Sequence, residues 1–309
     1  MSPNILIATA LVLLGGAGYG SMFAANKIVA DAGFPVLAYL FWQSLIGAAL
    51  VFGLRSIRWR RPNTSRRAVA HYVGSAAFGM LIPTGVLVLA ADELPSSVLT
   101  LTMTLIPSLT YTFAFVLRVE PLRWLSLAAI VLGLVGVLLI VVPQGGLPDA
   151  SAAIWILPAL IAPVSAAANN LIVATLRPPE SDSLTLGGAV LLGGAVVMLP
   201  IATLNGDLVV FWQTPAALTG VIWAAVAQAV GFFCLYEIIR RAGPVFFSQI
   251  SYVIVACGIG WGFALFAERP SAWVWGAVAL MTMGLALANA AVARAPHDAD
   301  GSRSRHHHS

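Results

Sequence analysis

Ten apolar stretches, separated mostly by short connections, run through nearly the whole sequence. A helix needs about 20 apolar residues to cross a membrane, because each residue adds about 1.5 Å across a hydrocarbon layer about 30 Å thick. The expected spans are residues 4–29, 34–54, 70–91, 97–117, 124–142, 152–176, 184–204, 216–239, 244–267 and 271–293. We therefore predict an all-α integral membrane protein with ten transmembrane helices.

The composition excludes an ordinary water-soluble domain. Hydrophobic residues make up 60% of the chain and charged residues 9%, against about 45–50% and about 25% in soluble domains. Too little polar material is present to cover a soluble fold of this length. The uncovered apolar surface must face lipid, so membrane lipid is the first expected partner.

The basic residues test the count of spans, since Lys and Arg collect in cytoplasmic loops. One set of alternate loops holds Arg55, Arg58, Arg60, Arg61, Arg66, Arg67, Arg118, Arg123, Arg177, Arg240 and Arg241, and Arg294 follows the last span. The other set holds only Lys27 and Arg269. This alternation predicts that both termini are cytoplasmic. It also explains the arginine-rich loop without any nucleic-acid partner.

An internal repeat gives the expected architecture. The segment SMFAANKIVA begins at Ser21, and SAAANNLIVA begins at Ser165, 144 residues later. Glu120 and Pro121 correspond to Glu268 and the nearby Pro270, with an offset of 148. Both offsets map each span onto the fifth span after it. Because the repeating unit has an odd number of helices, its second copy enters the membrane from the opposite side. The pattern therefore predicts two inverted five-helix repeats, as in many secondary transporters.

This repeat divides the chain into three parts. The first repeat is expected over residues 1–146 and the second over residues 147–295. Residues 296–309 form a tail in which three consecutive histidines precede the final Ser309, a run typical of a purification tag.

Several motifs resemble those of a known superfamily. They are YGSMFAANK in the first span, PSSVLTLTMTLIPSL and VEPLRWLSLAAIVLGLVGVLL around the fourth and fifth spans, and AERPSAWVWGAVALMTMGLALA near the end. With these segments the chain is similar to the drug/metabolite transporter superfamily, and within it to ten-helix metabolite exporters of the bacterial aromatic amino acid type. The resemblance implies a transporter of the bacterial inner (plasma) membrane. Members often carry an Arg in the second span where this chain has Gln43, so no role of that Arg is carried over.

Span four carries the clearest polar stripe. Thr100, Thr104, Ser108 and Tyr111 are spaced by four, four and three residues, which places their hydroxyls along one helical face. With the 148 offset, Thr100 maps to Ser248 and Thr104 to Tyr252, so we expect spans four and nine to face one cavity. The alternative is that these hydroxyls bond to backbone carbonyls of their own helix and serve packing.

Amides and aromatic side chains complete the predicted substrate site. Amides are costly to leave unpaired in a membrane, and they offer both donors and acceptors to an amino acid. The amide candidates are Asn26, Gln43, Asn170, Gln228 and Gln249, with Trp42 and Tyr252 as aromatic walls. Bonds between helices are the alternative role of the amides, and an interfacial position is the alternative for tryptophans.

Ionisable residues separate two mechanisms. A proton-coupled pump usually needs a carboxylate or His deep in the membrane. Glu237 lies three and four residues before Arg240 and Arg241, which predicts a local ion pair, and Lys27 could pair with Asp31 in the same way. His71 is expected at the cytoplasmic end of span three. Small multidrug pumps of the same superfamily rely on a Glu in the first helix, which has no equivalent here.

These observations favour a transporter that exports amino acids, both aromatic and other neutral ones, and related small metabolites by alternating access. The alternative is a proton-coupled efflux pump for drugs or toxic cations. An enzyme is not expected, because the sequence contains neither HExxH nor GxSxG and no cysteine cluster. We expect no cofactor and no metal. A small-molecule substrate is the remaining expected partner, and a monomer would suffice.

Overall fold

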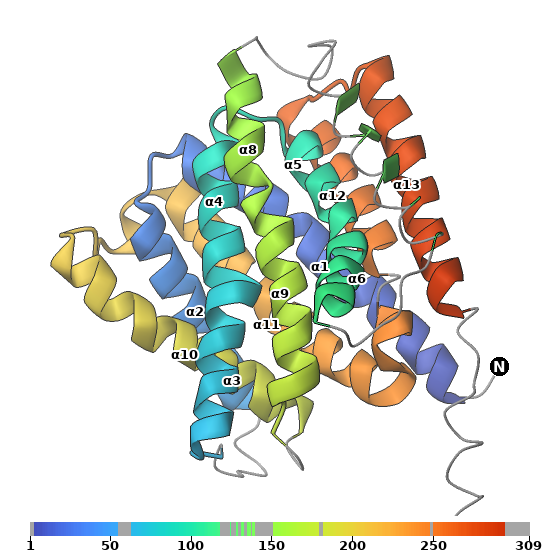
Figure 1. Ribbon diagram of the computed structural model, residues 1–309. Coiled ribbons are helices and arrows are strands. Elements are labelled where there is room, and N and C mark those ends of the chain that lie inside the picture. The colour runs from blue at the N-terminus through green and yellow to red at the C-terminus, as the bar shows by residue number, and fades with distance from the viewer. Residues whose placement is uncertain are drawn as a thin grey trace, which may run out of the picture.

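The computed structural model describes residues 3–54, 63–117, 151–178, 182–247 and 250–293, together with isolated positions between 124 and 139. All regular elements in these ranges are helical (Figure 1). The α-helices are α1 (Pro3–Asp31), α2 (Val36–Leu54), α3 (Arg66–Ala76), α4 (Ile82–Ala91), α5 (Ser96–Thr102), α6 (Ile106–Val116), α8 (Ile156–Ala159), α9 (Ile161–Leu176), α10 (Ser183–Leu204), α11 (Pro215–Phe247), α12 (Ile250–Phe266) and α13 (Ala272–Ala293).

Shorter helical turns join some of these elements into longer rods. The π-helix η2 (Ala77–Leu81) links α3 to α4, and the 3₁₀ turn η3 (Met103–Leu105) links α5 to α6. Two further 3₁₀ turns are η4 (Ser151–Trp155), before α8, and η5 (Phe211–Gln213), before α11.

Among the described residues, six helical segments are long and apolar enough to cross a membrane. They are Leu6–Asp31, Val36–Leu54, Arg66–Ala91, Ile156–Val173, Ser183–Leu204 and Pro215–Arg241. Each other predicted span also has helices in its place except 124–142, most of which lies outside the described residues. The multi-pass helical membrane class is therefore confirmed, and the count of ten stays a prediction.

One predicted boundary is wrong. Span eight was expected to end at residue 239 and span nine to begin at residue 244. In the structure α11 continues to Phe247 and α12 begins at Ile250. Proline removes one intrahelical hydrogen bond but holds φ near the helical value, so a helix can run through Pro244.

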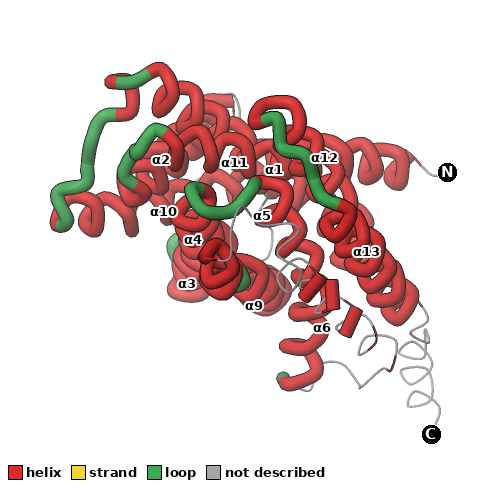
Figure 2. Tube along the Cα trace, turned by 90° about the horizontal axis from the view of Figure 1, so that it is seen from above, coloured by secondary structure: helices red, strands yellow, loops and turns green. Residues whose placement is uncertain are grey.

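Helices α1 and α11 lie in the middle of the bundle, with α2 and α10 on one side and α12 and α13 on the other (Figure 2). Helix α9 packs against the rod of α3, η2 and α4 and also against α6. Large apolar side chains remain exposed on the outer faces, including Leu13, Val196 and Phe263. Exposed apolar surface on this scale suits contact with lipid.

Glycines bring α1 close to α12. A Cβ atom added at Gly16 would lie 2.5 Å from Val253 Cβ, and one at Gly20 would lie 2.8 Å from the carbonyl oxygen of Ile254. Small residues let membrane helices approach closely and gain packing contacts along their backbones. The GxxxG step of α1 therefore serves helix packing.

Replacing Gly20 with Ala should lower the stability of the purified protein. The added methyl would collide with backbone atoms that cannot move independently, and overpacking of this kind destabilises by about 1–3 kcal/mol. The matched control is Gly53→Ala in α2, where nothing lies within 4 Å of the added atom. Thermal unfolding in detergent should show a lower midpoint for Gly20→Ala only. Equal midpoints would contradict the assigned packing.

Candidate functional site

A cavity of about 150 Å³ lies between α1, the η2–α4 segment, η3, α6, α9, α11 and the start of α12. Its apolar wall includes Phe23, Leu87, Met103, Ile106, Phe232 and Ile254. Its polar lining consists of Tyr19, Asn26, Thr84, Asn169, Asn170, Gln228 and Ser251. An apolar wall with a few polar anchors is the usual composition of a small-molecule site.

The polar lining is neutral. Among the described residues, no Asp, Glu, His, Lys or Arg lines this cavity. Amide and hydroxyl groups can pair with a polar ligand, but they cannot neutralise a net charge that leaves water. This arrangement favours uncharged or zwitterionic ligands.

Asn26 and Asn170, paired by the internal repeat, both line the cavity. Asn26 Oδ1 accepts a hydrogen bond of 2.7 Å from the hydroxyl of Tyr39, which is fully buried in α2. Asn170 Nδ2 donates to Thr110 Oγ1 of α6 at 3.0 Å. Each amide therefore connects two helices and borders the cavity at the same time. Both roles considered for these amides from the sequence are compatible with the geometry.

Gln228 of α11 also lines the cavity, as expected, and its side-chain oxygen has no hydrogen-bond partner. Asn169 has the same property and was not among the predicted residues. The repeat alignment concealed it, because Asn169 falls opposite Ala25 while its neighbour Asn170 falls opposite Asn26. The adjacent pair of asparagines in an apolar helix was the available signal. Tyr19, Thr84 and Ser251 were also missed.

The four hydroxyls predicted to face a cavity from span four lie outside the lining of this one. Met103 and Ile106 line the cavity, whereas Thr100, Thr104, Ser108 and Tyr111 are not among its lining residues. Thr100 Oγ1 bonds to the carbonyl of Ser96 at 2.6 Å, and a Cβ atom added at Gly258 of α12 would meet it directly. Thr104 Oγ1 bonds to the carbonyl of Leu101. A hydroxyl satisfied by its own helix can pack against a neighbouring helix, so a hydroxyl stripe does not require a cavity.

Trp42 and Gln43 of α2 lie outside the cavity lining. The Trp42 indole Nε1 donates to the carbonyl of Val209 at 2.8 Å, and its ring packs with Phe41, Phe211 and Trp212. Gln43 is fully buried, and neither of its amide atoms has a partner. Ser248 and Gln249 lie outside the described residues, as does the side chain of Tyr252.

One end of the bundle is held by an arrangement that we name the end clamp, made of Lys27, Ala91, Ser96, Ser97 and Glu268. The ammonium of Lys27 donates to the carbonyl of Ala91 at 3.1 Å and pairs with Asp31 at 3.3 Å, as predicted. Glu268 Oε1 accepts from the Ser96 amide at 2.8 Å, and Oε2 accepts from the Ser97 amide at 3.1 Å. A cation thus sits at the C-terminus of α4 and an anion at the N-terminus of α5, which both helix dipoles favour.

The backbone beside the end clamp is strained. Ala267 has φ of 50°, a left-handed conformation that a residue with a side chain rarely adopts. Strain of this kind persists only where surrounding contacts enforce it. Here the following residue, Glu268, is fixed by three hydrogen bonds to the start of α5, including one from Ser96 Oγ at 2.9 Å.

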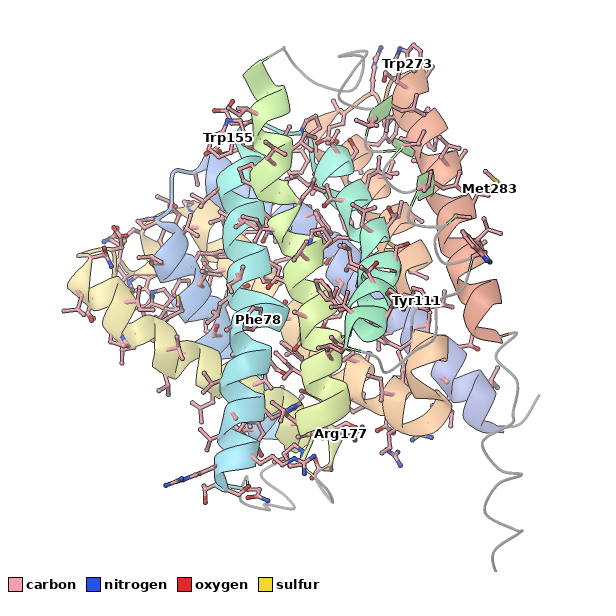
Figure 3. All side chains as sticks on the ribbon, in the orientation of Figure 1. Phe78, Tyr111, Trp155, Arg177, Trp273 and Met283 are labelled. Atoms are coloured by element: carbon pink, nitrogen blue, oxygen red, sulfur yellow. The ribbon has the colours of Figure 1, made fainter. Side chains whose placement is uncertain are left out.

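The opposite end of the bundle gathers arginines. Trp155 and Trp273 lie near one end in Figure 3 and Arg177 lies at the other. Arg177 covers the ring of Tyr236, whose hydroxyl lies 2.9 Å from His71 Nε2. His71 belongs to the second turn of α3, near the start of predicted span three, and its side chain is fully buried between helices.

The expected pairing of Glu237 with its neighbouring arginines is confirmed. Arg241 Nε lies 2.6 Å from Glu237 Oε1, Arg240 also binds this carboxylate, and Ser183 Oγ donates to Oε2 at 2.9 Å. Glu237 does not line the cavity.

Replacing Glu268 with Gln should weaken the end clamp. The variant loses the negative charge at the start of α5 and one of the two carboxylate acceptors, and hydrogen bonds to charged groups contribute about 1.5–3 kcal/mol. Glu93→Gln is the control, because Glu93 is an exposed residue of the α4–α5 connection, next to the end clamp. We expect the thermal midpoint in detergent to fall for Glu268→Gln and to stay unchanged for the control. A midpoint unaffected by Glu268→Gln would show that these bonds are not stabilising.

Known proteins match this chain at the level of family and fold. No curated protein matches it, whereas 27 chains of solved structures do. One of them, described as "Crystal structure of protein", is 19% identical with a TM-score of 0.65, and the match covers 91% of this chain and 97% of that one. At this identity the likeness shows the fold alone. Residues 6–142 match the EamA-like transporter family. The first part of the chain is thus similar to this family, and the match covers less than half of the 309 residues.

Proposed function

We propose that this protein exports neutral amino acids, aromatic ones included, and related small metabolites across the bacterial inner membrane by alternating access. The observation that carries the proposal is the cavity enclosed by helices of both halves of the chain, with its neutral amide and hydroxyl lining. A cavity of about 150 Å³ accommodates a group the size of a benzene ring. A zwitterionic amino acid brings no net charge into it.

The pattern of helix contacts supports two inverted repeats. Helix α1, in predicted span one, packs on α11 and α12, in predicted spans eight and nine. Its repeat partner α9 packs on the rod of α3, η2 and α4 and on α6, which belong to predicted spans three and four. Exchanging each span with its partner five spans away reproduces both contacts. A pseudo-twofold relation between the halves requires this exchange.

The distribution of charge supports the proposed orientation. Arg177, Arg240 and Arg241 gather around Tyr236 and Glu237, whereas Lys27 lies in the end clamp. The positive-inside rule then places the arginine end in the cytoplasm and the end clamp outside. The cavity lining extends toward the arginine end as far as Phe247 and Ile250, and it includes Leu87, one turn before Ala91 of the end clamp. Because the end clamp joins the helices on that side, we take this conformation as the one closed to the outside.

Alternating access then assigns a role to the end clamp. Release to the outside requires α1, α4, α5 and the α12–α13 connection to separate at the end where the clamp joins them. Breaking a few hydrogen bonds at helix termini is compatible with motion on the microsecond to millisecond timescale. The end clamp would hold the closed conformation until substrate binding favours the other one.

Counterflow in proteoliposomes tests the substrate class. Preloaded vesicles should accumulate labelled phenylalanine and other neutral amino acids, while lysine and glutamate should compete at least about 100-fold less well, because burying an uncompensated charge costs several kcal/mol. Empty liposomes are the control. Absence of uptake for all neutral amino acids would refute the substrate assignment and leave the fold unaffected.

The alternative is a proton-coupled pump for drugs or toxic cations. It predicts that Glu237→Gln abolishes transport and that transport collapses without a pH gradient. We expect instead that Glu237→Gln retains counterflow, since Glu237 is bound by two arginines and Ser183 outside the cavity. Asp31→Asn, at the other end of the bundle, is the matched control. Loss of counterflow in a folded Glu237→Gln protein would favour the pump.

Cysteine labelling tests the orientation. In a Cys234→Ala, Cys257→Ala background, a cysteine replacing the exposed Arg269 should react with an impermeant maleimide added outside intact cells. A cysteine replacing Arg66, also exposed but at the start of α3, should react only after the cells are opened. The opposite result would invert the topology.

A further inference from the structure

Two buried amide oxygens in the cavity have no partner within the protein. They are Asn169 Oδ1 and Gln228 Oε1. The two side chains are only 5% and 2% exposed. More than about 90% of buried polar groups in proteins are hydrogen-bonded, and an unpaired one costs about 1–3 kcal/mol. Unpaired acceptors that border a cavity therefore indicate a donor supplied by the ligand.

The backbone of the cavity wall fixes the position of Asn169. Gly79 lies in the π-helix η2, and a Cβ atom added there would lie 2.7 Å from Asn169 Nδ2 and 2.8 Å from its Cγ. The amide group therefore packs directly against a residue that has no side chain. One turn earlier on α9, Ser165 Oγ donates to the carbonyl of Phe78 in the same π-helix at 2.9 Å. Figure 3 shows Phe78 midway along this rod.

Two adjacent contacts, one of Asn169 and one of Ser165, thus join α9 to η2. A π-helical turn shifts the usual hydrogen-bond register, and such turns are frequent at functional sites. Here it presents a carbonyl to Ser165 and a glycine surface to Asn169. The amide packs against Gly79, and its oxygen has no hydrogen-bond partner in the protein.

Few ligand groups carry enough hydrogen-bond donors to bind both acceptors. Gln228 comes from α11 and Asn169 from α9, so a single ligand group that binds both must offer at least two donors in different directions. A hydroxyl donates once and an ionised carboxylate does not donate, whereas an ammonium donates three times. The absence of a lining carboxylate among the described residues means that this ammonium would be bound by neutral oxygens.

We propose that Asn169, seated on Gly79, and Gln228 form the subsite that accepts hydrogen bonds from the primary ammonium group of the substrate. This inference rests on the proposed function and adds a specificity-determining residue, Asn169, to it. Neutral acceptors bind an ammonium without the strong ion pair that a carboxylate would form. Such binding selects the group and still permits its release at the other face of the membrane.

A series of substrates that differ only in N–H donors tests the subsite. The probes are phenylalanine and its N-methyl, N,N-dimethyl and N,N,N-trimethyl derivatives, which keep the positive charge while donors are removed. Competition against labelled phenylalanine in counterflow should show at least about tenfold weaker competition by the trimethyl derivative in the wild type, as expected for a lost hydrogen bond to a charged group.

Variants of Asn169 separate recognition from structure. Asn169→Leu removes the acceptor, so the preference for phenylalanine over the trimethyl derivative should fall to about threefold or less. Asn169→Asp keeps the acceptor oxygens and the shape, so it should retain the preference. Gly79→Ala adds a methyl group that would displace the intact Asn169 amide, so it should also lower the preference for phenylalanine over the trimethyl derivative. Thermal unfolding in detergent checks that each variant is folded.

The outcomes distinguish this inference from the proposed function. If wild-type vesicles take up no amino acid, the proposed function itself fails. If they take up phenylalanine but Asn169→Leu keeps the full preference, or if Asn169→Asp loses it as completely as Asn169→Leu, the ammonium subsite is overturned.

Discussion

A membrane interior supplies no hydrogen bonds, so the polar groups of this chain must find their partners within the protein. Most of the described contacts between helices follow from that constraint. Tyr39 bonds to Asn26 and joins α2 to α1, while His71 meets Tyr236 and joins α3 to α11. Threonines in α5 and η3 bond back to their own helices instead. Asn169 Oδ1 and Gln228 Oε1 are left unpaired on the cavity wall, whereas the unpaired amide of Gln43 lies away from it.

The sequence predicts those features that depend on local spacing. Long apolar stretches predict membrane helices because length and hydropathy alone decide insertion. Separations of three and four residues predict the pairs Lys27–Asp31 and Glu237–Arg241, because such residues share a helical face. Asn26, Asn170 and Gln228 were identified because an amide is rare and costly in an apolar helix. These predictions need no knowledge of which helices are neighbours.

Features that depend on the neighbouring helix could not be predicted. Thr100 and Asn169 are both polar residues in apolar helices, yet one packs on Gly258 and the other faces a cavity. The difference arises from how each helix is rotated, and the turns η2 and η3 change that rotation within a single span. The contact of Glu268 with Ser96 joins residues 172 positions apart. Spacing within one helix carries no information about such pairs.

Glycine packing and the end clamp together suggest how the halves can move without losing their contacts. Gly16 and Gly20 of α1 face Val253 and Cys257 of α12. Between these surfaces the contacts come from packing of small groups, and packing of this kind tolerates small sliding motions between helices. Directional hydrogen bonds at the end clamp join α1 to the end of α4 and α5 to the α12–α13 connection. An α1–α12 interface of this kind, with the end clamp at one end, can be held in one conformation by few interactions. The free energy that separates its conformations can then be as small as the binding energy of one small substrate.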